Sequence, residues 1–180
     1  PTPSLTLDLK EDRWIRAVEI RPSNRAVTHH SVIFSANVSA MSALSSSGMF
    51  DVLGVWAVGT PPTVYPEGTG RWVRKGQMLR TNLHYHPNGT PQVDRTRVGL
   101  YFGKGEMKKE VAAALAGNIT FSIPPNEPNF ELRSVYMVDQ DINIVSFFPH
   151  MHLRGKDMKM TATLPDGRQQ TLLNVPAYDF

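Results

Sequence analysis

Turn-forming residues interrupt this sequence at short intervals, and their spacing constrains the fold more than any other feature. Clusters rich in proline, glycine and short polar residues lie at 22–24, 45–48, 59–62, 66–68, 87–89, 124–125 and 165–167. Between them lie short runs rich in β-branched and aromatic residues, at 26–34, 77–86, 97–102, 129–138, 142–153 and 158–164. Short strands bounded by frequent turns are typical of all-β domains. The sequence therefore predicts an all-β fold, an antiparallel jelly-roll β-sandwich.

One segment departs from this pattern. Residues 106–116 are mostly strong helix formers and are followed by Gly117, so we expect a short surface helix there. Pro124 and Pro125 then predict a domain boundary, because proline neither continues a helix nor pairs within a central strand. The predicted domains are residues 1–125 and 126–180. The second, with about 55 residues, is too small to stand alone, and we expect it to be the first part of a truncated domain.

The composition excludes several classes of protein. Hydrophobic residues make up 41% of the 180 residues and charged residues 19%, which excludes disorder, collagen and coiled coils. No apolar run of about 18 residues is present, so we expect no membrane span, and no secretory leader opens the sequence. The net charge of +3 comes from dispersed lysines and arginines, so we expect no nucleic-acid partner.

Six histidines and no cysteine define the metal chemistry that the chain can carry. The histidines lie in three close pairs: His29 and His30, His84 and His86, and His150 and His152. Random placement would give only roughly a third of one such pair, so the pairing indicates metal binding. Imidazole ligands without thiolate suit copper, zinc, nickel or iron. A site with three histidines and an open position would be of the catalytic type.

The spacing of two pairs places both members on one face of a strand. Residues i and i+2 of a strand point to the same side, so we expect His84 and His86 together on the polar face of their strand. His150 and His152 share a face of a predicted strand that is apolar on both sides. Two imidazoles on such a buried face can chelate a metal with little rearrangement.

The third pair poses a geometric problem. His29 and His30 are adjacent and would point to opposite faces of a regular strand, so two ligands to one ion require a β-bulge or a strand end. In a regular strand only one of them would bind, and the pair alone leaves this open. Ser31 follows, but no Gly-x-Ser-x-Gly turn is present to make it a nucleophile. No His-Glu-x-x-His motif is present, and a zinc hydrolase would need a general base that the sequence does not identify.

Around these histidines the sequence resembles the copper type II, ascorbate-dependent monooxygenases, the family of dopamine β-monooxygenase and peptidylglycine α-hydroxylating monooxygenase, and in particular a bacterial member. The resemblance extends along nearly the whole chain, and the order and spacing of its motifs are specific. The stretches that carry it are Ala-Val-Thr-His-His-Ser-Val-Ile-Phe at 26–34, Val-Trp-Ala-Val-Gly at 55–59 with Tyr-Pro-Glu at 65–67, Leu-His-Tyr-His-Pro at 83–87 with Asp-Arg at 94–95 and Val-Gly-Leu-Tyr-Phe at 98–102, Ile-Pro-Pro at 123–125, and His-Met-His-Leu-Arg-Gly-Lys at 150–156.

This resemblance implies two jelly-roll domains that each hold one copper. It implies that His29, His30 and His84 ligate an electron-transfer copper. It also implies that His150 and His152 ligate the copper that activates O2 and are the catalytic residues. In the family, ascorbate reduces both coppers, and a C–H bond of the substrate is hydroxylated. The resemblance further implies a periplasmic or secreted protein with a small-molecule or peptide substrate, which the sequence does not identify.

The sequence departs from the family at the second copper. The family's oxygen-activating copper takes a methionine as third protein ligand, downstream of the His-x-His motif, and no methionine of this chain matches it. His86 has a counterpart in the family that is not a ligand, so we leave it out of the first site. We therefore expect this chain to bind copper without hydroxylating a substrate by itself. The alternative is a non-enzymatic copper-binding or electron-transfer module on the same fold.

Overall fold

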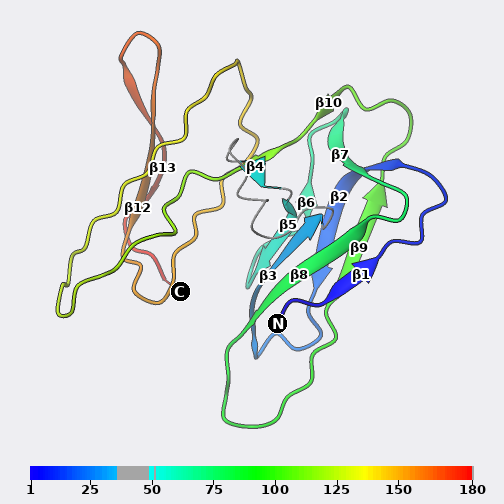
Figure 1. Cartoon of the computed structure of the whole chain (residues 1–180), viewed down its shortest axis with the longest axis horizontal. Coiled ribbons are helices and arrows are strands. Elements are labelled where there is room, and N and C mark those ends of the chain that lie inside the picture. The colour runs from blue at the N-terminus through cyan, green and yellow to red at the C-terminus, as the bar shows by residue number, and fades with distance from the viewer. Residues whose placement is uncertain (36–48, 51, 180) are drawn as a thin grey trace. The chain divides into compact units, whose positions relative to one another are not determined.

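The computed structural model describes residues 1–35, 49–50 and 52–179, and within these ranges it contains strands and no helix (Figure 1). In this part of the chain there is accordingly no helix of the length and apolarity needed to cross a membrane. Two compact units are present, Pro1–Asp139 and Gln140–Phe180. The separation between them lies downstream of the boundary expected at Pro124 and Pro125, and the two-domain organisation stays a prediction.

Two sheets form most of the first unit. One has the order β1 (Ser4–Thr6), β8 (Met78–Tyr85), β3 (Thr28–Ser35) and β5 (Val52–Ala57), with every neighbouring pair antiparallel. The other is built around β2 (Arg13–Arg21), which pairs antiparallel with β6 (Thr63–Val64), β7 (Thr69–Val73) and β9 (Arg97–Phe102). The short β10 (Lys109–Glu110) extends this second sheet by pairing parallel with β7.

One apolar core joins the two sheets. Its eight buried residues are Ile33, Leu53, Trp56 and Leu79 from the first sheet and Ile15, Val18, Ile20 and Val73 from the second. The sheets come very close at Gly54 of β5, where an added Cβ would lie 2.9 Å from Cγ1 of Val18. Glycine is required there because the opposing sheet leaves no room for a side chain. The fold is thus an all-β sandwich, as predicted, and β10–β7 is a parallel exception to its antiparallel pairing.

Most of the predicted strands are confirmed, and two are wrong. The runs at 26–34, 77–86, 97–102 and 158–164 correspond to β3, β8, β9 and β12 (Met158–Thr163). Neither 129–138 nor 142–153 contains a strand, although both are rich in β-branched and aromatic residues. A strand needs a neighbour for its N–H and C=O groups, and in the described residues these two runs pair with none. The predicted turn at 45–48 lies outside the described residues.

The predicted helix at 106–116 is also wrong. Instead, the segment forms two short strands. In β10, Lys109 is paired with Thr69 of β7, and β11 (Ala113–Ala114) pairs with β4 (Met49–Phe50). The backbone N–H of Val111 donates to the carbonyl of Gly70 over 2.8 Å. Pairing with a strand edge satisfies the backbone groups that a helix would have satisfied internally. Tertiary context therefore overrides the helix propensity of this segment.

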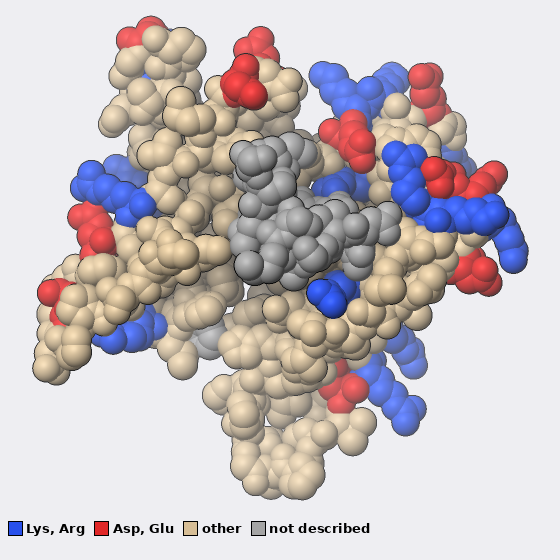
Figure 2. Space-filling view, in the orientation of Figure 1, with Lys and Arg blue, Asp and Glu red and all other residues tan. Residues whose placement is uncertain are grey.

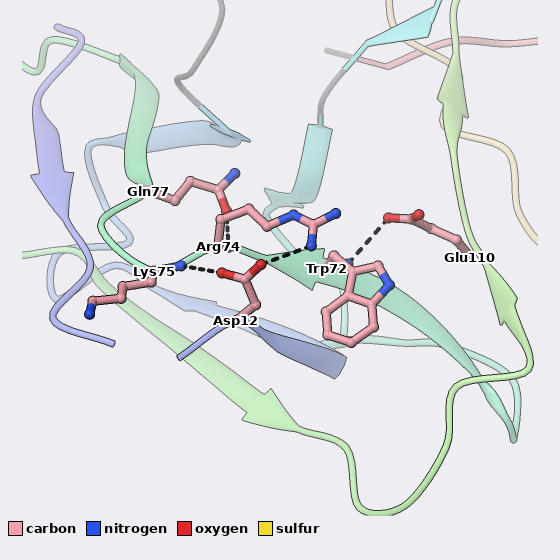
Figure 3. Close-up of polar contacts among 6 residues, drawn as sticks. All are labelled: Asp12, Trp72, Arg74, Lys75, Gln77 and Glu110. Carbon is pink, nitrogen blue, oxygen red and sulfur yellow. Dashed lines mark hydrogen bonds and ion pairs between the residues drawn. The ribbon is translucent and has the colours of Figure 1, made fainter. Parts of the chain in front are cut away.

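Polar contacts fix the turn between β7 and β8, and so the start of β8 (Figure 3). The Asp12 carboxylate accepts hydrogen bonds from the backbone N–H of Lys75 at 2.9 Å and from the Arg74 guanidinium at 3.0 Å. These two donors lower the pKa of Asp12, the backbone hydrogen bond contributing most. The Gln77 side chain accepts from the backbone N–H of Arg74 at 2.6 Å. This turn lies at the start of β8, whereas His84 lies near the other end of the strand.

The second unit contains a single hairpin among its described residues. Its strands are β12 and β13 (Gln169–Val175), which pair antiparallel with an irregularity between Met160 and Thr161. The turn between them includes Gly167, whose φ of +84° is a conformation that suits glycine. Several large apolar side chains of this unit are exposed, among them Leu153 at 79%. The hairpin alone thus leaves much of the apolar surface of this unit uncovered.

On the face drawn in Figure 2, Lys and Arg lie interspersed with Asp and Glu. Several ion pairs join neighbours in sequence, such as Arg21 with Glu19 at 2.6 Å and Arg168 with Asp166 at 2.6 Å. Pairs of this exposed kind contribute little to folding stability. These charged side chains therefore belong to the solvated surface and contribute little to the stability of the fold.

Candidate metal centre

The candidate centre lies where β3 and β8 pair in the first sheet. His30 of β3 is directly opposite His84 of β8 in the antiparallel ladder. Leu79 and Leu83 of β8 are buried on the inner face of the sandwich, whereas His84 is exposed on the outer face. His84 therefore occupies the polar side of its strand, as its spacing predicts. The strands' own pairing brings two imidazoles from distant parts of the sequence together.

A β-bulge at His29 adds a third imidazole. Thr28 pairs with Tyr85 and His30 pairs with His84, so β3 has one residue more than β8 between these two pairs, and that residue is His29. Thr28 and Ser31 are 2% and 0% exposed, and both face the interior. His29 and His30 between them are half-buried. The structure thus contains the bulge that two adjacent ligands require.

The three rings form a compact group. Their centroids are separated by 5.1 Å for His29–His30, 5.2 Å for His29–His84 and 4.8 Å for His30–His84, and all three pairs meet edge to face. One ligand nitrogen from each ring lies within 4.8 Å of the others. Imidazole nitrogens bind zinc at about 2.0–2.1 Å, so two such ligands of one ion lie at most about 4.2 Å apart. Small side-chain rotations suffice to close the group around an ion.

The donor set of this group fits a transition metal ion. The Nδ1 atoms of His29 and His30 lie 2.9 Å apart, so without an ion one ring donates its proton to the other. An ion bound at both nitrogens would replace that proton. Within the described ranges, no other set of three or more His, Cys, Asp or Glu side chains is arranged in this way. Three imidazoles without a carboxylate suit copper or zinc better than magnesium or calcium.

A hydrogen-bond network around the half-buried Asp94 includes Tyr85, the residue that follows His84. The Asp94 carboxylate accepts from the hydroxyls of Tyr85 at 3.1 Å and Thr96 at 2.5 Å. It also accepts from the backbone N–H groups of Ser23 at 2.8 Å and Asn24 at 3.0 Å. Burial by itself raises the pKa of Asp94, but these hydrogen bonds, that of Thr96 foremost, outweigh it and lower the pKa below its ordinary value. Burial, and then the bond to Asp94, raise the pKa of Tyr85.

The histidine that the resemblance leaves out of the first site lies outside this group as well. His86 follows the last residue of β8, and its backbone N–H donates to the carbonyl of Val27 over 2.7 Å. Its side chain is exposed and does not contribute to the group of three. Ser31 is completely buried on the inner face of β3, on the opposite side from His30. This placement gives no support to a serine nucleophile.

The second histidine pair has a different setting. His150 and His152 have ring centroids 5.0 Å apart with an interplanar angle of 81°, and Phe148 stacks against His150 at 6.2 Å. The two histidines are exposed and lie outside any strand, so the expectation of a buried strand face is wrong. The reason is again the missing neighbour strand, without which this run has no sheet face to occupy. Within the described residues, no third side chain of the His, Cys, Asp or Glu type completes the pair.

A tyrosine nevertheless fixes the backbone between these two histidines. The Tyr178 hydroxyl accepts from the N–H of Met151 at 3.2 Å and donates to the carbonyl of the same residue at 3.0 Å. Gly155 lies close to both residues, since an added Cβ would be 2.5 Å from Cβ of Met151 and 3.1 Å from Cδ1 of Tyr178. Sequence reasoning identified neither Tyr178 nor the network around Asp94. The motif at 94–95 gave a signal for Asp94, but nothing in the sequence shows that five donors converge on its carboxylate.

No protein-family model matches this chain, and no characterised protein shows significant similarity to it. The assignment of a function therefore rests on the geometry of the histidine groups and on the motifs that surround them.

Proposed function

We propose that this chain is part of a copper-dependent monooxygenase that hydroxylates a substrate C–H bond with O2, using ascorbate as reductant. His29, His30 and His84 would hold the electron-transfer copper, and His150 and His152 would be ligands of the oxygen-activating copper. The single observation that carries the proposal is the bulge at His29, which adds a third imidazole to the directly paired His30 and His84. The proposal includes jelly-roll topology for each domain and a periplasmic or secreted location.

The first site suits electron transfer because its ligands are held by paired strands. His30 and His84 belong to neighbouring strands of one sheet, and β3 is also paired on its other side with β5. Bound copper would supply one-electron redox chemistry at this position. Ligands on a paired sheet move little, so a change of oxidation state requires little rearrangement of the protein. The exposed His84 keeps one side of the group accessible to a small reductant.

The residues around the first site argue against hydrolysis. A zinc hydrolase needs a general base near the metal-bound water. The group of three contains no carboxylate. Asp94, the carboxylate that accepts from Tyr85 next to His84, is already occupied by hydrogen bonds from Tyr85, Thr96 and the backbone. Redox chemistry is therefore the better-supported use of this metal site.

A second candidate function is a copper-binding or electron-transfer module without hydroxylase activity. The observation in its favour is the contrast between the two histidine groups. The first has three ligands on a sheet, whereas the second has two exposed histidines outside any strand. The two candidates differ in the number of coppers bound and in their use of O2.

Copper titration of the purified protein tests the proposal. We expect His84→Ala to lose the tightly bound copper and His86→Ala, which changes an exposed histidine two residues away, to retain it. The Cu(II) electron paramagnetic resonance (EPR) spectrum should show nitrogen ligation, and ascorbate should bleach it. Unchanged copper stoichiometry in His84→Ala would refute the assignment of the first site. A second equivalent of copper that disappears in His150→Ala favours the monooxygenase, and a single equivalent favours the electron-transfer module.

A further inference from the structure

We propose that Asp94 is the positioning residue of the metal site, holding β3 and β8 in the register that gathers the three histidines. This inference rests on the proposed metal site and adds a residue that does not bind the ion. Asp94 follows β8 in the chain and precedes β9, and it is half-buried. Its two carboxylate oxygens bind different segments, and each segment leads to a different strand of the site.

The first oxygen, Oδ1, holds the turn that leads into β3. It accepts hydrogen bonds from the backbone N–H of Ser23 at 2.8 Å, the Ser23 hydroxyl at 3.1 Å and the backbone N–H of Asn24 at 3.0 Å. The carbonyl of Asn24 in turn accepts from the backbone N–H of Thr28 at 3.1 Å and from its hydroxyl at 2.9 Å. Thr28 immediately precedes the bulge residue His29. Oδ1 is thus linked to the first residue of β3 through one intervening turn.

The second oxygen, Oδ2, holds the end of β8. It accepts from the Tyr85 hydroxyl at 3.1 Å and from the Thr96 hydroxyl at 2.5 Å. Tyr85 immediately follows His84 and is the register partner of Thr28. Both residues of the Thr28–Tyr85 pair are therefore tied to the same carboxylate. This pair stands on one side of the bulge, and the His30–His84 pair stands on the other.

These contacts matter for metal binding because a bulge can move. If the extra residue shifted along β3, the alternation of the intervening residues would change and a histidine would turn toward the interior. Asp94 fixes the pair that bounds the bulge, so the extra residue remains His29. Partners that orient metal ligands without binding the ion themselves typically contribute about 10–100-fold to metal affinity.

The test compares Asp94→Ala with Asp12→Ala. Asp12 is a matched control, because it also accepts a backbone and a side-chain hydrogen bond in the same unit but at the β7–β8 turn. We expect Asp94→Ala to weaken Cu(II) binding about 10–100-fold and to change the EPR spectrum of the copper-saturated protein. Asp12→Ala should leave both unchanged, even where it lowers the free energy of unfolding. Wild-type affinity and spectrum in Asp94→Ala, or equal effects of both substitutions, overturn the proposal.

Two milder variants test the same proposal if Asp94→Ala does not fold. Tyr85→Phe removes only the bond from β8, and Asp94→Asn keeps one oxygen that can accept from Ser23 and Asn24. Both should show smaller changes of the same kind, and wild-type copper spectra in both overturn the proposal.

If the wild-type protein binds no copper, the proposed function fails and positioning is tested separately. The imidazole NMR signals of His29 and His84 in the metal-free protein should then move in Asp94→Ala while those of His150 stay unchanged. Unmoved signals of His29 and His84 would overturn the role of Asp94.

Discussion

Deleting His29 tests directly whether this residue is the extra, bulged residue in the pairing of β3 with β8. The register pairs Thr28 with Tyr85 and His30 with His84, so removing His29 leaves both pairs aligned and only abolishes the bulge. We expect the free energy of unfolding to change by less than about 1 kcal/mol, as for other changes outside a core. Copper affinity should fall by at least about 100-fold, or about 2.8 kcal/mol, because a ligand is worth more than an orienting partner.

The alternative, in which His29 is a regular member of β3, predicts a larger loss of folding stability on deletion. If His29 were a regular member of β3, its deletion would turn the preceding residues to the opposite face. Val27 and Thr28, which are 5% and 2% exposed, would then leave the interior. Exposing the valine alone costs about 1.5–3 kcal/mol.

Urea unfolding of the metal-free proteins and copper competition with a chelator measure the two quantities. His29→Ala, which keeps the extra residue and removes the ring, is the matched comparison. A loss of more than about 3 kcal/mol on deletion, together with a near-neutral His29→Ala, would refute the assignment of the bulge.

Two further predictions concern the stability of the first unit. The pKa of Asp94 is lowered on folding from its ordinary value of 3.8, so its hydrogen bonds contribute stability that is complete above that value and is lost as the pH falls through the lower, folded pKa. The difference in unfolding free energy between wild type and Asp94→Asn should therefore shrink as the pH falls from 5 into that range, and a pH-independent difference in urea unfolding would contradict this. Gly70→Ala should destabilise by about 1–3 kcal/mol or more, because its Cβ would lie 2.3 Å from the carbonyl oxygen of Ile15. Gly99→Ala on β9, whose added Cβ has its nearest neighbour at 3.5 Å, should be nearly neutral in thermal unfolding, and equal effects of the two substitutions would disprove the packing argument.

The sequence predicted those parts of the fold in which local pattern and pairing agree. β3, β8, β9 and β12 each combine a β-rich run with flanking turns, and each pairs with a neighbour. The runs at 129–138 and 142–153 are also rich in β-branched and aromatic residues, but this composition indicates only a tendency toward extended backbone. It does not supply the neighbour that satisfies the backbone, and these two runs show the difference. The residues at 106–116 do favour a helix locally, but pairing with the edge of β7 decides the structure that this segment adopts.

The candidate site was predictable to a similar extent. The spacing of His84 and His86 indicated the polar face of their strand. The adjacency of His29 and His30 showed only that two ligands to one ion would require a β-bulge or a strand end, and left open whether both bind. The network at Asp94 was not predictable, because its donors come from residues 23, 24, 85 and 96, which only the folded chain brings together. Tyr178 is similar, since it reaches Met151 across 27 positions of the sequence.

The direct pairing of His30 with His84 also has a consequence for a chain that has no cysteine. An ion held by both residues would cross-link two strands and close a loop of about 55 residues, as a disulfide does in a cysteine-containing domain. For a loop of that length, restriction of the unfolded chain is worth about 4 kcal/mol. The melting temperature of the sandwich would then report the supply of metal in its surroundings. The metal-free protein would then be more susceptible to proteolysis than the metal-bound protein.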